Sequence, residues 1–218
     1  MDDLRGKVAV ITGGASGMGL AFAHRFAAAG MRLAIADIEV PAIDSALTEL
    51  RPTGVEAIGV RCNVSEPASM EELAAEVYEA YGAAHVICLN AGVSAAGTMA
   101  DLKLIDWEWV LGVNLWGVIH GIDTFLNRLV TQDEGHFVIT ASICGHTCYP
   151  TSGPYAATKH AAIAIAETLY NELSAASPQV GVTALCPGFV NPQITSRSGE
   201  PRRGTEFTSR ASPSPSQK

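Results

Sequence analysis

Short apolar runs alternate with longer amphipathic segments along most of this chain. The runs are rich in Val, Ile and Leu, as expected of strands, and occupy residues 7–12, 31–37, 55–62, 85–90, 136–142 and 180–188. Helical periodicity predicts helices over 17–29, 41–50, 66–80, 101–130 and 153–176. Alternating strands and helices imply right-handed crossovers, and therefore an α/β fold with a doubly wound parallel sheet. Because the strands are continuously apolar, helices should cover both faces of that sheet.

The composition of the chain changes near its end. Residues 195–218 are rich in Ser, Pro and Arg, and Phe207 is their only large apolar side chain. Such a segment buries too little apolar surface to offset the entropy lost when it becomes ordered. We therefore expect one folded domain over 1–194 and a disordered tail over 195–218.

Composition and charge narrow the classes of partner. The formal net charge is −8 and Arg202-Arg203 is the one basic run, so nucleic acid is not an expected partner. Polar residues interrupt each apolar stretch before the ~20 residues that a membrane-spanning helix needs. Met1-Asp2-Asp3 leads directly into a strand-like segment and does not resemble a secretory signal. We expect a cytoplasmic protein without a membrane partner.

Five cysteines are scattered through the chain, at positions 62, 88, 144, 148 and 186. An odd, scattered set is typical of the reduced thiols of cytosolic proteins. Cys144, His146 and Cys148 offer three soft ligands on one short stretch, but no fourth ligand lies nearby in sequence. We interpret them as side chains of a pocket wall and expect no metal site.

A glycine-rich segment, TGGASGMG over 12–19, joins the first expected strand to the first expected helix. Glycines allow a sharp turn and the close approach of a pyrophosphate, and the helix N-terminus offers free amides with a favourable dipole. Asp37 ends the second strand, where a carboxylate accepts both ribose hydroxyls of NAD and repels the 2′-phosphate of NADP. NAD is therefore the expected cofactor and NADP is disfavoured. The alternative is that Asp37 is an ordinary solvated residue at a strand end.

Two further strand ends carry asparagines. Asn90-Ala91-Gly92 follows the fourth strand, where small residues let the chain pass beneath a flat ligand and the Asn side chain can brace neighbouring strands. Asn63 and Val64 follow the third strand. Asn63 is either a contact of the adenine edge or a plain turn residue.

A second group of residues suggests acid–base chemistry. Tyr155 and Lys159 are four residues apart in an expected helix, hence one turn apart on one face, and an ammonium there can lower the pKa of a phenol. Ser142 ends the fifth strand, at the sheet edge where ligands bind, and its hydroxyl could hold a substrate oxygen. Asn114 lies in a largely apolar helical stretch and needs a polar partner. Each of these residues alone is more often structural.

The sequence resembles the short-chain dehydrogenase/reductase family. It matches the family's Thr-Gly-x-x-x-Gly-x-Gly loop over 12–19, Asn90-Ala91-Gly92, Asn114, Ser142, Tyr155-x-x-x-Lys159 and Pro187-Gly188, in order over residues 5–190. The resemblance implies that Tyr155 is the general acid/base and that Ser142 positions the substrate oxygen. It implies that Lys159 binds the nicotinamide ribose and that Asn114 holds a water in a proton relay. The expected cofactor-binding residues are Gly13, Ala15, Ser16, Gly17, Met18, Gly19, Asp37, Asn63, Val64, Asn90, Ala91, Gly92, Tyr155, Lys159, Pro187, Gly188 and Val190.

The sequence also departs from the family pattern. Asn63 stands where the family usually has Asp, and Pro192 replaces a Thr that commonly touches the nicotinamide amide, for which Thr195 is a possible substitute. Family members generally continue through a substrate-covering loop and a seventh strand. Because one interface of the usual tetramer uses that last strand, a homodimer is the expected assembly.

The family positions of the substrate pocket are mostly apolar and hold no fixed cation; they are Val93, Ser94, Ile143, Cys144, Tyr149 and Phe189. They predict a hydrophobic secondary alcohol or its ketone as the substrate of an NAD-dependent oxidoreductase. The alternatives are an NAD-binding protein without turnover, whose pocket is open to water, and a truncated product that folds poorly.

Overall fold

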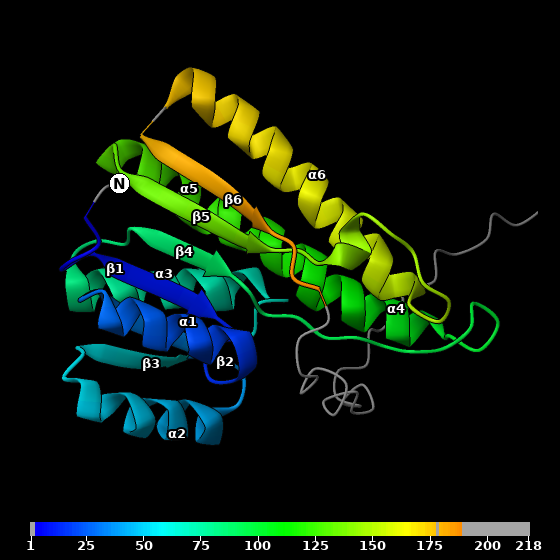
Figure 1. Ribbon diagram of the computed structural model, residues 1–218, viewed down its shortest axis with the longest axis horizontal. Helices are drawn as coiled ribbons and strands as arrows, with labels where there is room; N and C mark the ends of the chain where they lie inside the picture. The colour runs from blue at the N-terminus through cyan, green and yellow to red at the C-terminus, as the bar shows by residue number, and fades with distance from the viewer. Residues whose placement is uncertain (1–2, 178, 189–218) are drawn as a thin grey trace, which may run out of the picture.

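The computed structural model describes residues 3–177 and 179–188 of the chain. Six parallel strands form one sheet in the order β3-β2-β1-β4-β5-β6, which confirms the doubly wound arrangement (Figure 1). The strands are β1 (Val8–Thr12), β2 (Arg32–Asp37), β3 (Ala57–Arg61), β4 (Val86–Leu89), β5 (Gly135–Thr140) and β6 (Val180–Leu185). The domain limit at 194 and the tail over 195–218 lie outside the described residues.

Helices cover both faces of the sheet, as its continuously apolar strands predict. Alternate residues of β1 show this: Val8 and Val10 belong to one buried cluster, and Ala9 and Ile11 to the other. The first cluster includes side chains of α3, α5 and α6, and the second includes side chains of α1 and α2. These helices are α1 (Gly17–Ala28), α2 (Val40–Leu50), α3 (Pro67–Tyr81), α5 (Gly117–Gln132) and α6 (Gly153–Ala176).

The prediction of one continuous α-helix over 101–130 is wrong in one respect. It consists of α4 (Leu104–Leu111), a π-helical turn η2 (Gly112–Trp116) and α5. Such a turn widens the backbone locally and is often found at functional sites. Leu104–Gln132 as a whole is long and apolar enough to cross a membrane by length and composition. Here it packs on the protein core, with Phe125 and Leu129 of α5 fully buried.

The order of the strands places the switch point of the sheet between β1 and β4. From β1 the chain winds outward through β2 and β3, and from β4 it winds in the opposite direction through β5 and β6. The loops after β1 and β4 therefore diverge at the carboxyl ends of two neighbouring strands, which is where ligands bind in such sheets. The glycine-rich segment and Asn90-Ala91-Gly92 are these two loops.

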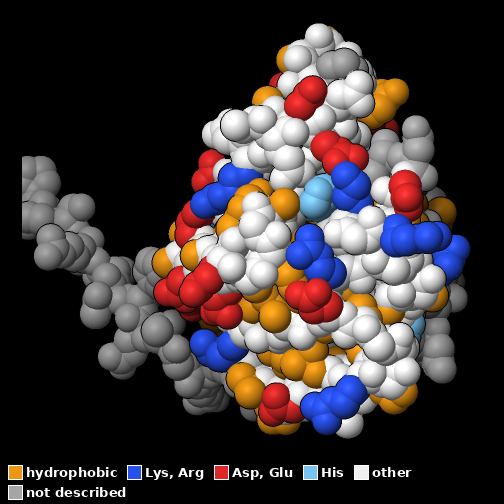
Figure 2. Space-filling view, turned by 90° about the vertical axis from the view of Figure 1, so that its left-hand side faces the viewer, with side chains coloured by type: hydrophobic (Ala, Val, Ile, Leu, Met, Phe, Trp, Pro, Cys, Tyr) orange, Lys and Arg blue, Asp and Glu red, His pale blue; other side chains and the backbone are white. Residues whose placement is uncertain are grey.

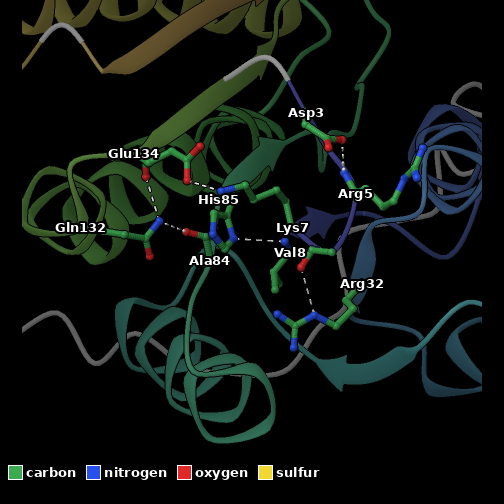
Figure 3. A network of polar contacts seen from close by, with 10 residues as sticks. Asp3, Arg5, Lys7, Val8, Arg32, Ala84, His85, Gln132 and Glu134 are labelled. Carbon is green, nitrogen blue, oxygen red and sulfur yellow. Dashed lines mark hydrogen bonds and ion pairs between the residues drawn. The ribbon is translucent and has the colours of Figure 1, made fainter.

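The opposite edge of the sheet, at the amino ends of the strands, holds a polar network. Basic and acidic side chains are interspersed across this face of the molecule (Figure 2). Lys7 forms an ion pair with Glu134, and the Nδ1 atom of His85 accepts a hydrogen bond from the amide of Val8 at 3.1 Å (Figure 3). Gln132 donates to the carbonyl oxygens of Ala84 and Glu134 at 3.0 and 2.8 Å. Burial, with a smaller effect of Lys7, lowers the pKa of His85.

Candidate active site

The glycine-rich loop packs closely against the end of β4. Gly13 has φ +61°, and a Cβ atom added there would lie 2.9 Å from Cα of Ala91. A Cβ added at Gly19 would lie 2.1 Å from the carbonyl oxygen of Gly13. Both positions therefore require glycine for steric reasons, and the turn is too tight for any side chain there.

The first turn of α1 is open to a ligand. Ser16 precedes the helix in an extended conformation and makes no side-chain capping bond, and the turn carries no acidic residue. A Cβ added at Gly17 would meet no atom within 4 Å, and the residue has φ +53°. Amides at an uncapped helix N-terminus suit an anionic group such as a pyrophosphate. The loop residues expected to hold the dinucleotide, Gly13, Ala15, Ser16, Gly17, Met18 and Gly19, all lie here.

Asp37 lies at the carboxyl end of β2 and faces the same loop. Its carboxylate accepts hydrogen bonds from the amide of Ala15 at 3.3 Å and from the amide of Glu39 at 3.2 Å. Asp37 is only 5% exposed, so the alternative of a solvated strand-end residue does not describe it. The fixed carboxylate gives this end of the site a negative charge next to the glycine-rich loop.

Asn63 and Val64 have local structural contacts. The Asn63 side chain donates to Glu66 at 2.7 Å and accepts from the amide and hydroxyl of Ser65 at 3.2 and 2.8 Å. These bonds favour the turn-residue alternative over a contact with adenine. Val64 is buried, and a Cβ added at Gly117 of α5 would lie 2.8 Å from its side chain.

Asn90 braces three strands, as one of its predicted roles requires. Its side-chain amide donates to the carbonyl oxygens of Thr12 and Gly13 at 3.1 and 3.4 Å, and its Oδ1 accepts from the hydroxyl of Thr140 at 3.3 Å. The hydroxyl of Thr12 in turn accepts from the amides of Asn90 and Ala91. The ends of β1, β4 and β5 are thus held together beside the glycine-rich loop.

Ser142 and Tyr155 meet at the carboxyl edge. Ser142 lies two residues beyond the end of β5, and its hydroxyl oxygen accepts a hydrogen bond from the amide of Cys144 at 3.1 Å. The Ser142 hydroxyl is therefore free to donate its own proton toward Tyr155. Burial raises the pKa of Tyr155, and the hydrogen bond from Ser142 opposes that rise. The pair forms a small polar centre in a largely buried setting.

Lys159 is buried at the same edge and is only 3% exposed. Its Nζ atom donates to the carbonyl oxygen of Thr140 at 2.6 Å and lies 5.6 Å from the centre of the Tyr155 ring. Burial lowers the pKa of Lys159 to about 8. Burial of the phenol dominates and raises the pKa of Tyr155, so the lowering of that pKa by the ammonium stays a prediction.

Asn114 lies in the π-helical turn and has the polar partners that its burial demands. Its Oδ1 accepts from the amide of Val93 at 2.8 Å, and its Nδ2 donates to the carbonyl oxygen of Val93 at 2.9 Å and to the hydroxyl of Thr158 at 3.2 Å. A Cβ added at Gly92 would lie 3.5 Å from Asn114 Oδ1 and 3.7 Å from Lys159 Nζ. Asn114 and Lys159 therefore border the same small space beside Gly92.

The expected pocket residues are only partly gathered. The amide of Ile143 donates to the carbonyl oxygen of Pro187 at 2.9 Å, which joins the loop after β5 to Pro187-Gly188. Tyr149 instead lines an apolar groove of about 370 Å³ with Met99, Trp107 and Cys148. Neither Ser142 nor Tyr155 lines this groove. Phe189, Val190, Pro192 and Thr195 lie outside the described residues.

The candidate metal ligands of the described residues include the five cysteines. All five cysteines are free thiols. Within residues 3–177 and 179–188, no group of three or more His, Cys, Asp or Glu side chains is arranged to hold a metal ion. This applies also to Cys144, His146 and Cys148.

Sequence reasoning did not identify Thr140 and Thr158, which connect the predicted residues to one another. Thr140 links Asn90 to Lys159, and Thr158 links Asn114 to Tyr155. Both threonines are buried. Their burial next to predicted site residues could have identified them, but a single sequence does not show which individual residues are buried.

The sequence profile of the family described as short chain dehydrogenase matches residues 7–203. This chain belongs to that family. The C alpha-dehydrogenase of Sphingobium sp. is 34% identical over 200 residues, which are 91% of this chain and 65% of that protein. The 1-deoxy-11-beta-hydroxypentalenate dehydrogenase of Streptomyces avermitilis is 34% identical over 94% of this chain and 76% of its own length.

Solved structures of dehydrogenases have the fold of this chain. A short chain dehydrogenase/reductase from Burkholderia phymatum in complex with NAD has a TM-score of 0.90 and 41% identity, over 98% of this chain and 76% of that one. NAD⁺-bound xylitol dehydrogenase has a TM-score of 0.83 and 30% identity, over 88% of this chain and 74% of that one. The present chain thus spans about two thirds to three quarters of the length of these relatives.

Proposed function

We propose that this short-chain dehydrogenase is an NAD(H)-dependent oxidoreductase that interconverts a hydrophobic secondary alcohol and its ketone. The observation that carries the proposal is buried Lys159, whose Nζ atom lies 5.6 Å from the centre of the Tyr155 ring and borders Gly92, at the edge where the glycine-rich loop lies. A proton-transferring phenol beside a cofactor loop is the arrangement that carbonyl reduction requires.

The residues present fit a dinucleotide. The uncapped first turn of α1 would receive the pyrophosphate, and the tight packing of Gly13 and Gly19 keeps side chains out of its path. Asp37 would accept the adenosine ribose hydroxyls. A 2′-phosphate would meet that buried carboxylate, and Lys and Arg are absent from the sequence 12–19 and from both neighbours of Asp37, so NAD is preferred over NADP.

When bound, NAD(H) would supply the hydride-transfer chemistry at the substrate carbon. Tyr155 takes the hydroxyl proton when the alcohol is oxidised and returns a proton to the carbonyl oxygen when the ketone is reduced. Ser142 donates a hydrogen bond to the same oxygen and so fixes its place relative to Tyr155. Lys159 would hold the ribose hydroxyls of the cofactor, and its ammonium would supply a positive charge beside the phenol.

One variant tests the catalytic role. Tyr155→Phe should lower kcat by at least about a hundredfold, because general acid–base groups contribute rate factors of that size. Turnover is followed by the absorbance of the reduced nicotinamide over a panel of alcohols and ketones, and affinity by titration calorimetry with NAD and NADP. Undiminished turnover in Tyr155→Phe, or tighter binding of NADP than of NAD, would contradict the proposal.

Binding of NAD with no turnover across the whole panel would contradict the proposal and favour the alternative, a protein that binds NAD without turnover.

We also propose that the protein is cytoplasmic and forms a homodimer. The scattered free thiols support the first, since they suit a reducing compartment. Sedimentation at several concentrations measures the assembly, and a monomer or a tetramer would contradict the second.

A further inference from the structure

The helix that carries Tyr155 begins with little local support. Thr151, just before it, has φ +68°, which a β-branched residue rarely adopts. Ser152 stands at the N-cap of α6 but makes no capping bond, and its hydroxyl donates to the carbonyl oxygen of Tyr149 at 2.7 Å. An uncapped first turn tends to fray. Tyr155 lies in that first turn, so its position must depend on contacts from elsewhere.

Thr158 supplies such a contact. Its hydroxyl donates to the carbonyl oxygen of Tyr155 at 2.8 Å and accepts from the Nδ2 atom of Asn114 at 3.2 Å. Thr158 and Asn114 are each 1% exposed, so water does not compete for these bonds. One hydroxyl group therefore ties the Tyr155 turn of α6 to the π-helical turn.

The Asn114 end of this connection is itself fixed. The two hydrogen bonds between the Asn114 side chain and the main chain of Val93 hold the amide group in one orientation. Both amide protons of Asn114 are used, one by Val93 and one by Thr158. The path from Val93 through Asn114 and Thr158 to Tyr155 thus connects the loop after β4 with the start of α6.

A second tether lies on the next residue of the helix. Lys159 donates to the carbonyl oxygen of Thr140, and the Thr140 hydroxyl donates to Asn90. The nicotinamide ribose is the expected ligand of Lys159, so this tether is available to change when cofactor binds. The Thr158 contact involves no group assigned to cofactor or substrate and can hold the turn throughout the reaction.

We propose that Thr158 is a positioning residue, which holds the Tyr155 turn of α6 against the π-helical turn so that the Tyr155 and Ser142 hydroxyls meet. The expected effect of Thr158 on kcat rests on the proposed function. Its expected effect on the stability of the Tyr155 turn does not.

Two variants that differ by one hydroxyl group test this role. Thr158→Ser keeps a hydroxyl at the same position, and Thr158→Ala removes it. Misplacing reacting groups by about 1 Å can cost a hundredfold in rate, so Thr158→Ala should lose at least about tenfold in kcat, with the dissociation constant for NAD within about twofold of wild type. Thr158→Ser should retain most of the wild-type kcat. Equal kcat values for the two variants would overturn the proposal.

Amide hydrogen exchange measured by mass spectrometry gives a readout independent of turnover. Peptides covering 153–163 should exchange faster in Thr158→Ala than in Thr158→Ser, whereas peptides of α1 and α3 should not differ. If the wild-type protein turns over no substrate, the proposed function fails and this comparison alone judges Thr158. Equal exchange of 153–163 in the two variants would then refute its positioning role. Should Thr158→Ala not fold, Thr158→Val replaces it, since Val keeps the volume and lacks the hydroxyl.

Discussion

Replacing Gly19 by Ala should damage the cofactor loop more than it helps the helix. The added Cβ would lie 2.1 Å from the carbonyl oxygen of Gly13 and 2.9 Å from Nδ2 of Asn90. Gly13 has little room to retreat, because its own Cα hydrogen faces the Ala91 backbone at the place where a Cβ would lie 2.9 Å from Cα of Ala91. The loop must therefore shift as a unit away from the end of β4.

The magnitude follows from two opposed effects. Overpacking of this kind costs about 1–3 kcal/mol, and the rigid backbone contact places Gly19→Ala near the upper end of that range. Ala in a helix gains at most about 1 kcal/mol over Gly. The free energy of unfolding should therefore fall by about 2 kcal/mol, which lowers Tm by about 4–8 °C in a chain of this size. NAD affinity should fall as well, because the displaced loop is the one that receives the pyrophosphate.

Differential scanning calorimetry and calorimetric titration with NAD measure both effects. Gly112→Ala is the matched control, because a Cβ there would lie 3.5 Å from Ser65, at ordinary contact distance, and the residue has helical dihedral angles. It should be neutral or stabilising by up to about 1 kcal/mol. If Gly19→Ala melts and binds NAD as the wild-type chain does, the steric account of the loop is wrong.

Two further predictions concern buried titratable groups. The pKa of His85 is lower in the folded chain than in the unfolded chain, so the unfolded chain binds a proton at His85 more readily. The contribution of neutral His85 to the free energy of unfolding is therefore complete above the ordinary His pKa. It is lost as the pH falls through the pKa of His85 in the folded chain. Between about pH 7.5 and 5, the free energy of unfolding measured in urea should fall less in His85→Gln than in wild type. An equal fall in the two proteins would contradict this. Lys159→Met should abolish turnover and yet raise Tm at neutral pH, since it removes a buried ammonium whose pKa burial lowers to about 8. A lower Tm in Lys159→Met would show that its bond to Thr140 outweighs the cost of burial.

The strands were predictable because parallel sheets bury both faces and leave a continuous apolar signal. Val8–Thr12, for example, is buried throughout, and helix 153–176 was predicted with the limits that the structure has. The switch point between β1 and β4 then follows from the order of the elements. These features depend on patterns spread over many residues, so single exceptions do not obscure them.

The features that were not predicted depend on single contacts. The π-helical turn interrupts a segment whose periodicity alone gives one helix, and it occurs where Asn114 bonds to Val93. Likewise, the direction of the pKa of Tyr155 depends on how deeply the phenol is buried, which spacing from Lys159 does not reveal. Residue types show where a site lies in the sequence, whereas the hydrogen-bond partners and pKa values of its residues follow only from the packed structure.

The ion pair of Lys7 with Glu134 and the bond from Val8 to His85 lie across the full length of the strands from Tyr155. One stabilising polar network therefore lies at the rim of the sheet opposite the candidate active site. An engineer can strengthen the rim near Lys7 without touching the machinery at the other, and the usual trade between robustness and turnover is avoided by distance.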